Sequence, residues 1–152
     1  FDFIVFFKYY NLMKFTGNCH CGSISIEANI DLSKVYACHC TDCQIFSGGP
    51  FRVMVTVDKS DVEISGSLKE YLKIADSGNK RIQAFCNNCC TSLYSAPTSK
   101  DKFSIRTGVF HNSEKLEPIK HLYGNSSVKW IKDIYKKDWV ETMPKSNFFK
   151  PK

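Results

Sequence analysis

The chain has 152 residues, of which 43% are hydrophobic and 24% charged. This is the composition of one ordinary globular domain, and it excludes a disordered or low-complexity protein. The mean hydropathy is -0.27, and the early apolar run ends at Phe7, far short of the roughly 20 residues that a membrane-spanning helix needs. Lys and Arg total 21 against 15 Asp and Glu, a formal net charge of +6. No arginine-rich run accompanies this surplus, so we expect a solvated basic face, with neither a membrane nor nucleic acid as partner.

Met13 divides the start of the chain. The residues before it are crowded with Phe and Tyr, whereas MKFTGNCHCGSISIEA resembles an ordinary protein start. We therefore interpret residues 1–12 as an upstream extension, 13–137 as the folded domain and 138–152 as a basic C-terminal tail. The alternative for residues 1–12 is a terminal strand that packs on the sheet. The opening lacks the basic start and small-residue cleavage site of a secretory leader, so we expect a cytoplasmic protein.

Short alternating segments, with turn residues about every ten residues, predict a mainly β domain. The first of them, SISIEANI, places Ile24 and Ile26 on one face and polar residues on the other. In chain order the expected strands are 23–30, 51–57, two strands joined around Gly66 within 61–74, then 80–85, 91–96 and 102–110.

Two segments are expected to be helical. Residues 40–46 (CTDCQIF) predict a short helix with Thr41 as its cap. Residues 126–139 carry apolar residues at helical spacing with lysines opposite, and we expect this stripe to pack on the core rather than on a partner. The stripe consists of Val128, Ile131, Ile134 and Tyr135.

The cysteines are the informative feature of the sequence. They form a C-x-C pair, a C-x-C-x-x-C group and a C-x-x-C pair, followed directly by one more cysteine. At roughly 5% of the chain they are too few for a small disulfide-stapled secreted domain, and clustering of this kind indicates metal binding. The eight residues are Cys19, Cys21, Cys38, Cys40, Cys43, Cys86, Cys89 and Cys90.

These groups allow two partitions. In the first, the C-x-C and C-x-x-C pairs close one four-thiolate site, and the three-cysteine group forms a second site with an open position. Three protein ligands and an open position are the pattern of a catalytic zinc, whereas four thiolates make a structural one. In the second partition, Cys90 or a histidine supplies a further ligand and both sites are closed. His20 and His39 point away from the neighbouring sulfurs if the backbone there is extended.

Several motifs then occur in order: GNCHCGSISIEA, CHCTDCQIFSGGPF, GSLKEY, KRIQAFCNNCCTSLYS and PIKHLYGNSSVKW. Together they resemble the glutathione-dependent formaldehyde-activating enzyme family, which also includes centromere protein V. The resemblance spans roughly residues 14–131 and makes 13–137 a zinc-binding domain of this type. It implies a folded β-tent of antiparallel sheets with one or two short helices and two zinc ions per chain. By position it implies that Cys19, Cys21, Cys86 and Cys89 hold a structural zinc, and that Cys38, Cys40 and Cys43 hold a catalytic zinc.

The resemblance also implies an activity. A carbon–sulfur lyase of this kind adds a thiol such as glutathione to a small aldehyde such as formaldehyde, giving an S-hydroxymethyl adduct. The alternative is a non-enzymatic, zinc-stabilised binding module like the centromere protein branch, with the basic C-terminal helix and tail as its contact surface. An enzyme needs an exchangeable position at the three-cysteine site, whereas a binding module does not. Because thiolate sites lose metal on oxidation, we expect the second ion to be the one that is lost.

Six positions outside the two clusters carry further expectations. Cys90 stands where the family pattern has glycine, which would permit a turn that other residues resist. His121 and Trp130 match recurring family positions, and we expect a structural histidine and a core tryptophan rather than a proton shuttle and a substrate platform. Arg106, Arg81 and Lys80 are positively charged and could pair with glutathione carboxylates, although nothing in the sequence shows that these side chains lie at the site.

Overall fold

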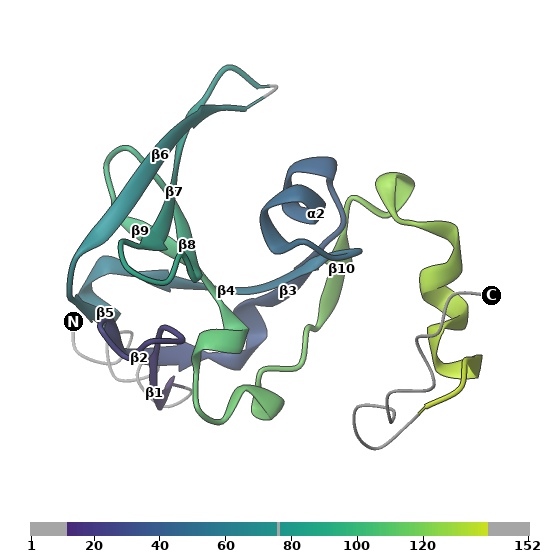
Figure 1. The fold of residues 1–152 in the computed structure, drawn as a ribbon, viewed down its shortest axis with the longest axis horizontal. Helices are drawn as coiled ribbons and strands as arrows, with labels where there is room; N and C mark the ends of the chain where they lie inside the picture. The colour runs from purple at the N-terminus through teal and green to yellow at the C-terminus, as the bar shows by residue number, and fades with distance from the viewer. Residues whose placement is uncertain (1–11, 76, 140–152) are drawn as a thin grey trace, which may run out of the picture.

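The computed structural model describes residues 12–75 and 77–139 of the chain. Within these ranges lie ten strands, one α-helix and six short 3-10 helices, so the predicted mainly β class is confirmed. The strands form two sheets that fold over one another (Figure 1). In the part of the chain described, no helix has the length and apolar character needed to cross a membrane.

The smaller sheet has the order β1-β2-β5 and is antiparallel. The larger sheet has the order β10-β3-β4-β9-β8-β7-β6, and its neighbours are antiparallel except for the parallel pair β10–β3. The strands of the smaller sheet are β1 (Leu12–Asn18), β2 (Ser25–Asp31) and β5 (Val62–Ser65). Those of the larger sheet are β3 (Val35–Cys38), β4 (Arg52–Asp58), β6 (Leu68–Ile74), β7 (Lys80–Cys86), β8 (Ser92–Pro97), β9 (Lys102–Arg106) and β10 (Lys120–Leu122).

The core lies between the two sheets. Strand register aligns Val35, Val55, Ile105 and Tyr94 across four neighbouring strands of the larger sheet, and all four are buried. They join one hydrophobic cluster with the alternating apolar residues of β2, such as Ile26. Each fully buried side chain of this size contributes about 1.5–3 kcal/mol relative to exposure, so this row stabilises the fold.

The opposite face of the larger sheet is polar. Cys38 lies directly across from Arg52, and Met54, two residues further along β4, lies across from Arg106. Since side chains alternate along a strand, these four lie on the side away from the core. The helix α2 (Thr41–Ser47) stands over this side of β3 and β4, away from β1 and β2 (Figure 1).

The predicted strands differ from the observed ones in a few places. The segment around Gly66 does join two strands, but β5 and β6 belong to different sheets. Gly66 has a φ of 115°, and a side chain there would meet Ile24 Cδ1 at 2.7 Å, which explains the glycine. The last predicted strand stops at Arg106, because residues 107–109 turn into a 3-10 helix. The short strands β3 and β10 were not predicted, since they are too brief to show alternation.

The expectation of a core-packed helix near the C-terminus is wrong. Lys129–Lys136 (η6) is a 3-10 helix, and its stripe is largely exposed, with Ile134 at 41% and Tyr135 at 67%. Trp130, expected in the core, is 51% exposed. A 3-10 helix has three residues per turn, so Ile131 and Ile134 still share one face, and the exposure of the stripe follows from where the segment lies rather than from its helix type. The segment also runs away from both sheets (Figure 1).

The predicted chain boundaries fall mostly outside the described residues. Residues 1–11 of the expected extension and 140–152 of the expected tail are not among them. Leu12 already pairs with Asp31, so β1 crosses the predicted boundary at Met13 without a break.

Candidate metal centres and active site

The structure brings four cysteines together from two distant turns. Cys19 and Cys21 lie in the turn between β1 and β2, while Cys86 ends β7 and Cys89 lies in the turn to β8. Their four sulfur atoms lie within 4.8 Å of one another, and none forms a disulfide. The Cys19–Cys21 and Cys21–Cys86 sulfur separations are 3.5 and 3.8 Å. Zinc–sulfur bonds of about 2.3 Å in tetrahedral geometry place sulfurs about 3.8 Å apart, so the donor set fits this ion.

Neighbouring donors favour the thiolate form in this four-cysteine cluster. The backbone N–H of Ile24 donates to Cys19 Sγ at 3.2 Å, and that of Cys89 donates to Cys86 Sγ at 3.4 Å. Hydrogen bonds from Ser23 lower the pKa of Cys21 to about 5. Thiolates are the form that binds metal, so the hydrogen bonds of these turns suit the four cysteines to hold a metal ion.

A second group of three cysteines lies at the start of α2. Cys38 ends β3, and Cys40 is the N-cap of α2, where its sulfur accepts from the Cys43 N–H at 3.4 Å. The Cys38–Cys40 sulfur separation is 3.6 Å, again suited to zinc. A hydrogen bond from Cys43 lowers the pKa of Cys38 to about 5, and the same bond, with burial, raises that of Cys43. Among the described residues no other His, Cys, Asp or Glu brings a ligand atom into this group.

The candidates for an additional ligand lie elsewhere. Cys90 is exposed and outside both groups. Its φ of 59° and the bond from its N–H to the Cys86 carbonyl, at 3.0 Å, show that it occupies a left-handed turn position suited to glycine. His39 Nε2 lies 2.8 Å from His121 Nδ1, and its ring packs on Phe51 at a centroid distance of 5.2 Å. The two histidines therefore contact one another, and the second partition finds no geometric support in the described residues.

Two arginines lie beside the three-cysteine group in a cavity of about 350 Å³. Arg52 and Arg106 line this cavity, and both are buried. Arg106 was a sequence candidate, whereas Arg52 was missed. A charged residue in the otherwise apolar run FRVMVTV was the available signal. Of the other candidates, Arg81 is partly buried within electrostatic range of Arg106, and Lys80 is exposed.

A separate cavity of about 590 Å³ lies near the C-terminal 3-10 helix. His39, His121 and Ile131 are among its lining residues. Trp130 does not line it. No described cysteine lines this cavity.

Comparison with known proteins agrees with the fold and the cysteine geometry. The model of the family described as glutathione-dependent formaldehyde-activating enzyme matches residues 14–126, so the chain belongs to this family. A relative from Schizosaccharomyces pombe, named only as an uncharacterized lyase, is 33% identical over 104 residues, covering 68% of this chain and 73% of that protein. A crystal structure of a Rhodobacter sphaeroides protein has a TM-score of 0.53 at 19% identity, over 72% of this chain and 99% of the other.

The resemblance noted from the sequence motifs is therefore confirmed. The family and the relative's name support a lyase or formaldehyde-activating type of function. The solved structure supports the fold alone, since its identity is low. The two cysteine clusters could hold metal ions, and their sulfur spacing suits zinc.

Proposed function

We propose that the protein is a zinc-dependent carbon–sulfur lyase that adds a thiol such as glutathione to a small aldehyde such as formaldehyde. The observation that carries the proposal is the cluster of three cysteines to which no described residue adds a fourth ligand. In the proposal Cys38, Cys40 and Cys43 hold the catalytic ion, and Cys19, Cys21, Cys86 and Cys89 hold a structural ion. A zinc ion in the three-cysteine cluster would supply an exchangeable position at which a thiol loses its proton readily.

The protein's own residues prepare this site. The N-cap position fixes Cys40 on the first turn of α2, and the helix places Cys43 on the same side. Arg52, directly across from Cys38 in the sheet, brings a positive charge next to the thiolates. That charge favours the anionic form of an incoming thiol as well as of the ligands.

The reaction balances without any further reactant. The thiol sulfur forms a bond to the aldehyde carbon while the carbonyl π bond breaks. The thiol proton ends on the former carbonyl oxygen, which becomes the hydroxyl group of an S-hydroxymethyl adduct. In the reverse direction the carbon–sulfur bond breaks and the aldehyde leaves, which is lyase chemistry.

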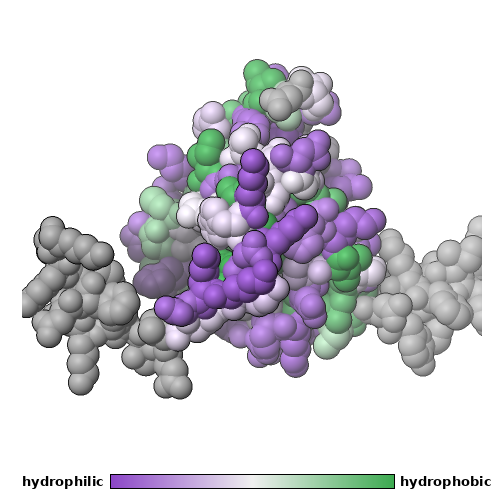
Figure 2. Space-filling view, turned by 90° about the vertical axis from the view of Figure 1, so that its right-hand side faces the viewer, coloured by the Kyte–Doolittle hydropathy of each residue, from purple (hydrophilic) through white to green (hydrophobic). Residues whose placement is uncertain are grey.

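The second candidate is a zinc-stabilised binding module. It is favoured by the exposed apolar side chains of η6, with Trp130 and Tyr135 more than half exposed. Figure 2 shows this side of the molecule, where hydrophobic residues are scattered among hydrophilic ones rather than gathered in a broad patch. A contact surface here would therefore be small, and the enzyme proposal rests on the stronger feature.

The test is zinc stoichiometry on the reduced protein, followed by a glutathione titration monitored by zinc-edge X-ray absorption. We expect two zinc ions per chain, one of which gains a sulfur ligand from glutathione and then supports adduct formation when formaldehyde is added. S-methylglutathione, which has no free thiol, is the matched control and should add no such ligand. Two zinc ions whose coordination does not change when glutathione is added, or a single zinc ion in fully reduced protein, would favour the binding module.

A further inference from the structure

The polar face of the larger sheet holds two buried arginines, and the proposed zinc chemistry uses only the positive charge of Arg52. Arg52 is 8% exposed and Arg106 is 7% exposed, and Arg81 lies close enough to act on the charge of both. Charged side chains are almost never buried to this extent unless they are paired. Within residues 12–75 and 77–139, no Asp or Glu forms an ion pair with any of the three.

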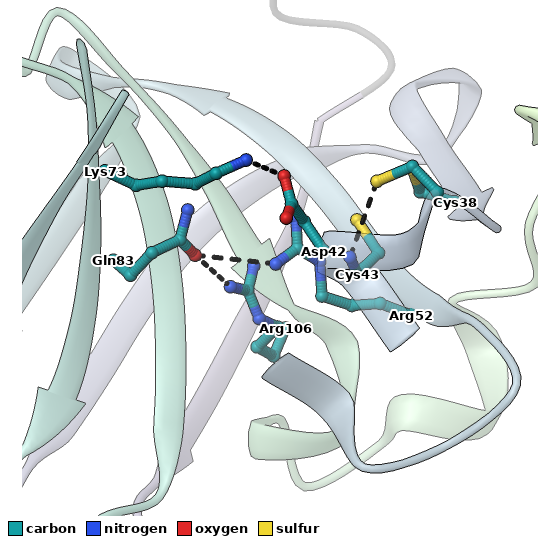
Figure 3. Close-up of polar contacts among 8 residues, drawn as sticks. Cys38, Asp42, Cys43, Arg52, Lys73, Gln83 and Arg106 are labelled. Atoms are coloured by element: carbon teal, nitrogen blue, oxygen red, sulfur yellow. Dashed lines mark hydrogen bonds and ion pairs between the residues drawn. The ribbon is translucent and has the colours of Figure 1, made fainter. Parts of the chain in front are cut away.

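The partners these arginines do have are neutral. Arg106 Nη2 and Arg52 Nη1 both donate to Gln83 Oε1, at 3.1 and 3.5 Å. Figure 3 shows the two guanidinium groups converging on this one oxygen. Arg106 also donates to the Ser92 hydroxyl and the Ser104 carbonyl. Arg52 Nε is buried and has no hydrogen-bond partner, so a donor remains unsatisfied at the site.

An acid that lies near the arginines is already neutralised. Asp42, on the first turn of α2, forms an ion pair with Lys73 of β6, above the arginines in Figure 3. The three thiolates do not balance the arginines either. Three thiolates around a zinc ion carry a net charge of about -1, against two arginine charges, or three with Arg81. The site therefore has room for at least one more negative charge.

The cavity next to these groups has the size and chemistry to admit part of a ligand. Its volume is about 350 Å³, and besides the two arginines it is lined by Phe46, Ser47 and Phe51 of α2 and the loop after it. The hydroxyl and the guanidinium groups suit an anion, and the aromatic rings suit an adjoining apolar portion. Because Cys38 and Arg52 are directly paired across β3 and β4, their Cβ atoms lie about 4.5–5.5 Å apart. The cavity that Arg52 lines therefore lies next to the three-cysteine cluster.

We propose that Arg52 and Arg106 form a carboxylate-binding subsite that recognises a carboxylate on the thiol substrate. This inference rests on the proposed function, because it assigns the substrate class of the same site. A guanidinium fork binds a carboxylate through two parallel hydrogen bonds, and the unsatisfied Arg52 Nε shows that this guanidinium is not fully paired within the described residues. The subsite selects anionic thiols over neutral ones and orients the sulfur towards the cysteines.

The test compares three probes that separate the carboxylate from the thiol. Glutathione has both groups, S-methylglutathione lacks the thiol, and glutathione diethyl ester lacks free carboxylates. Binding is measured by calorimetry on the zinc-loaded protein, with Arg52→Gln, Arg106→Gln and Arg106→Lys as variants. Lys115→Gln is the matched control, since it removes one exposed positive charge outside the cavity.

We expect S-methylglutathione to bind the wild-type protein and Lys115→Gln equally, and each Arg→Gln variant about 10- to 100-fold more weakly, the cost of losing a charged hydrogen bond. Arg106→Lys keeps the positive charge but not the forked guanidinium, so its affinity for S-methylglutathione should lie between those of the wild type and the Arg→Gln variants. The diethyl ester should bind wild type as weakly as glutathione binds the variants. The Arg→Gln variants should melt no lower than wild type, because each relieves repulsion between buried cations.

Several results would overturn the subsite. One is equal affinity of wild type and Arg52→Gln for S-methylglutathione. Another is full affinity of wild type for the diethyl ester. A third is calorimetric binding of inorganic phosphate without binding of any carboxylate probe. A sharp loss of melting temperature in both Arg→Gln variants, with unchanged binding in Arg106→Lys, would assign the arginines to the fold instead. If zinc never gains a sulfur ligand yet S-methylglutathione binding still depends on Arg52, the subsite stands and the proposed chemistry fails.

Discussion

Cys90 occupies a backbone conformation that its side chain disfavours. At a φ of 59° an L-residue with a Cβ costs about 1–2 kcal/mol relative to glycine. The position follows the C-x-x-C turn directly, so the chain must reverse there for Cys86 and Cys89 to meet the first cysteine pair. The sequence departure at this residue thus places local backbone strain next to the four-cysteine cluster.

We predict that Cys90→Gly stabilises the protein. The relief of strain outweighs the extra flexibility of the unfolded glycine chain, leaving a net gain of about 1 kcal/mol. Chemical denaturation of the reduced, zinc-loaded protein measures this change in the free energy of unfolding. Cys90→Ala, which keeps the Cβ, is the control and should leave stability nearly unchanged. An equal gain in both variants would attribute the effect to the thiol rather than to the backbone.

Gly17 illustrates a different constraint at a single position. It lies in β1, where it forms an isolated bridge to Phe110, and a Cβ at this point would meet the Phe110 Cα at 2.8 Å and the Val109 carbonyl oxygen more closely still. These are backbone atoms, which cannot rotate away.

Gly17→Ala is therefore expected to destabilise the fold by about 1–3 kcal/mol, the usual cost of overpacking. Thermal melting measures the change. Gly108→Ala is the control, since a Cβ there meets nothing within 4 Å. Matching melting temperatures for the two variants would show that β1 can shift away from residues 109–110.

At the scale of elements, each cysteine cluster has a distinct structural position. The four-cysteine cluster connects the β1–β2 turn of the smaller sheet to the β7–β8 turn of the larger one. The three-cysteine cluster is local, because its members span only the end of β3 and the first turn of α2. A metal ion in the first therefore restrains the packing of the two sheets, whereas an ion in the second restrains one loop.

This difference predicts opposite phenotypes for two matched substitutions. Cys86→Ser should lower the free energy of unfolding by about 2–5 kcal/mol, comparable to the loss of another long-range cross-link. Cys40→Ser should cost much less stability but abolish glutathione exchange and turnover. Urea denaturation and adduct formation are the two measurements. If both variants unfold equally readily, the division into a structural and a catalytic cluster is wrong.

At the scale of the whole molecule, the two faces of the larger sheet have different roles, one in core packing and one in the candidate site. One face is apolar and packs on the smaller sheet, while the other carries Cys38, Arg52 and Arg106. The site is thus built on strands whose other sides are fixed in the core. Such a base holds the charged groups in place despite their mutual repulsion.

Removing metal should expose how far the whole fold depends on it. We expect a chelator, added to reduced protein, to produce a cooperative loss of near-ultraviolet circular dichroism as the two sheets separate, and added zinc to restore it. Cys40→Ser should show the same loss with one fewer zinc released. A spectrum unchanged after complete zinc removal would mean that the hydrophobic core alone maintains the fold.

The sequence by itself determined the local features. Alternation predicted most strands, C-x-C and C-x-x-C spacing identified the cysteine groups, and ordered motifs indicated the family, because these signals depend on neighbours a few residues apart. Spacing alone left open which cysteine groups meet, and only the family resemblance implied it. The tertiary structure decided the rest: that β5 and β6 separate into two sheets, and that Arg52 joins Arg106 at Gln83. Those contacts depend on strand order and register between distant segments, which no local period encodes. The same holds for the C-terminal stripe, which is exposed because η6 runs away from both sheets.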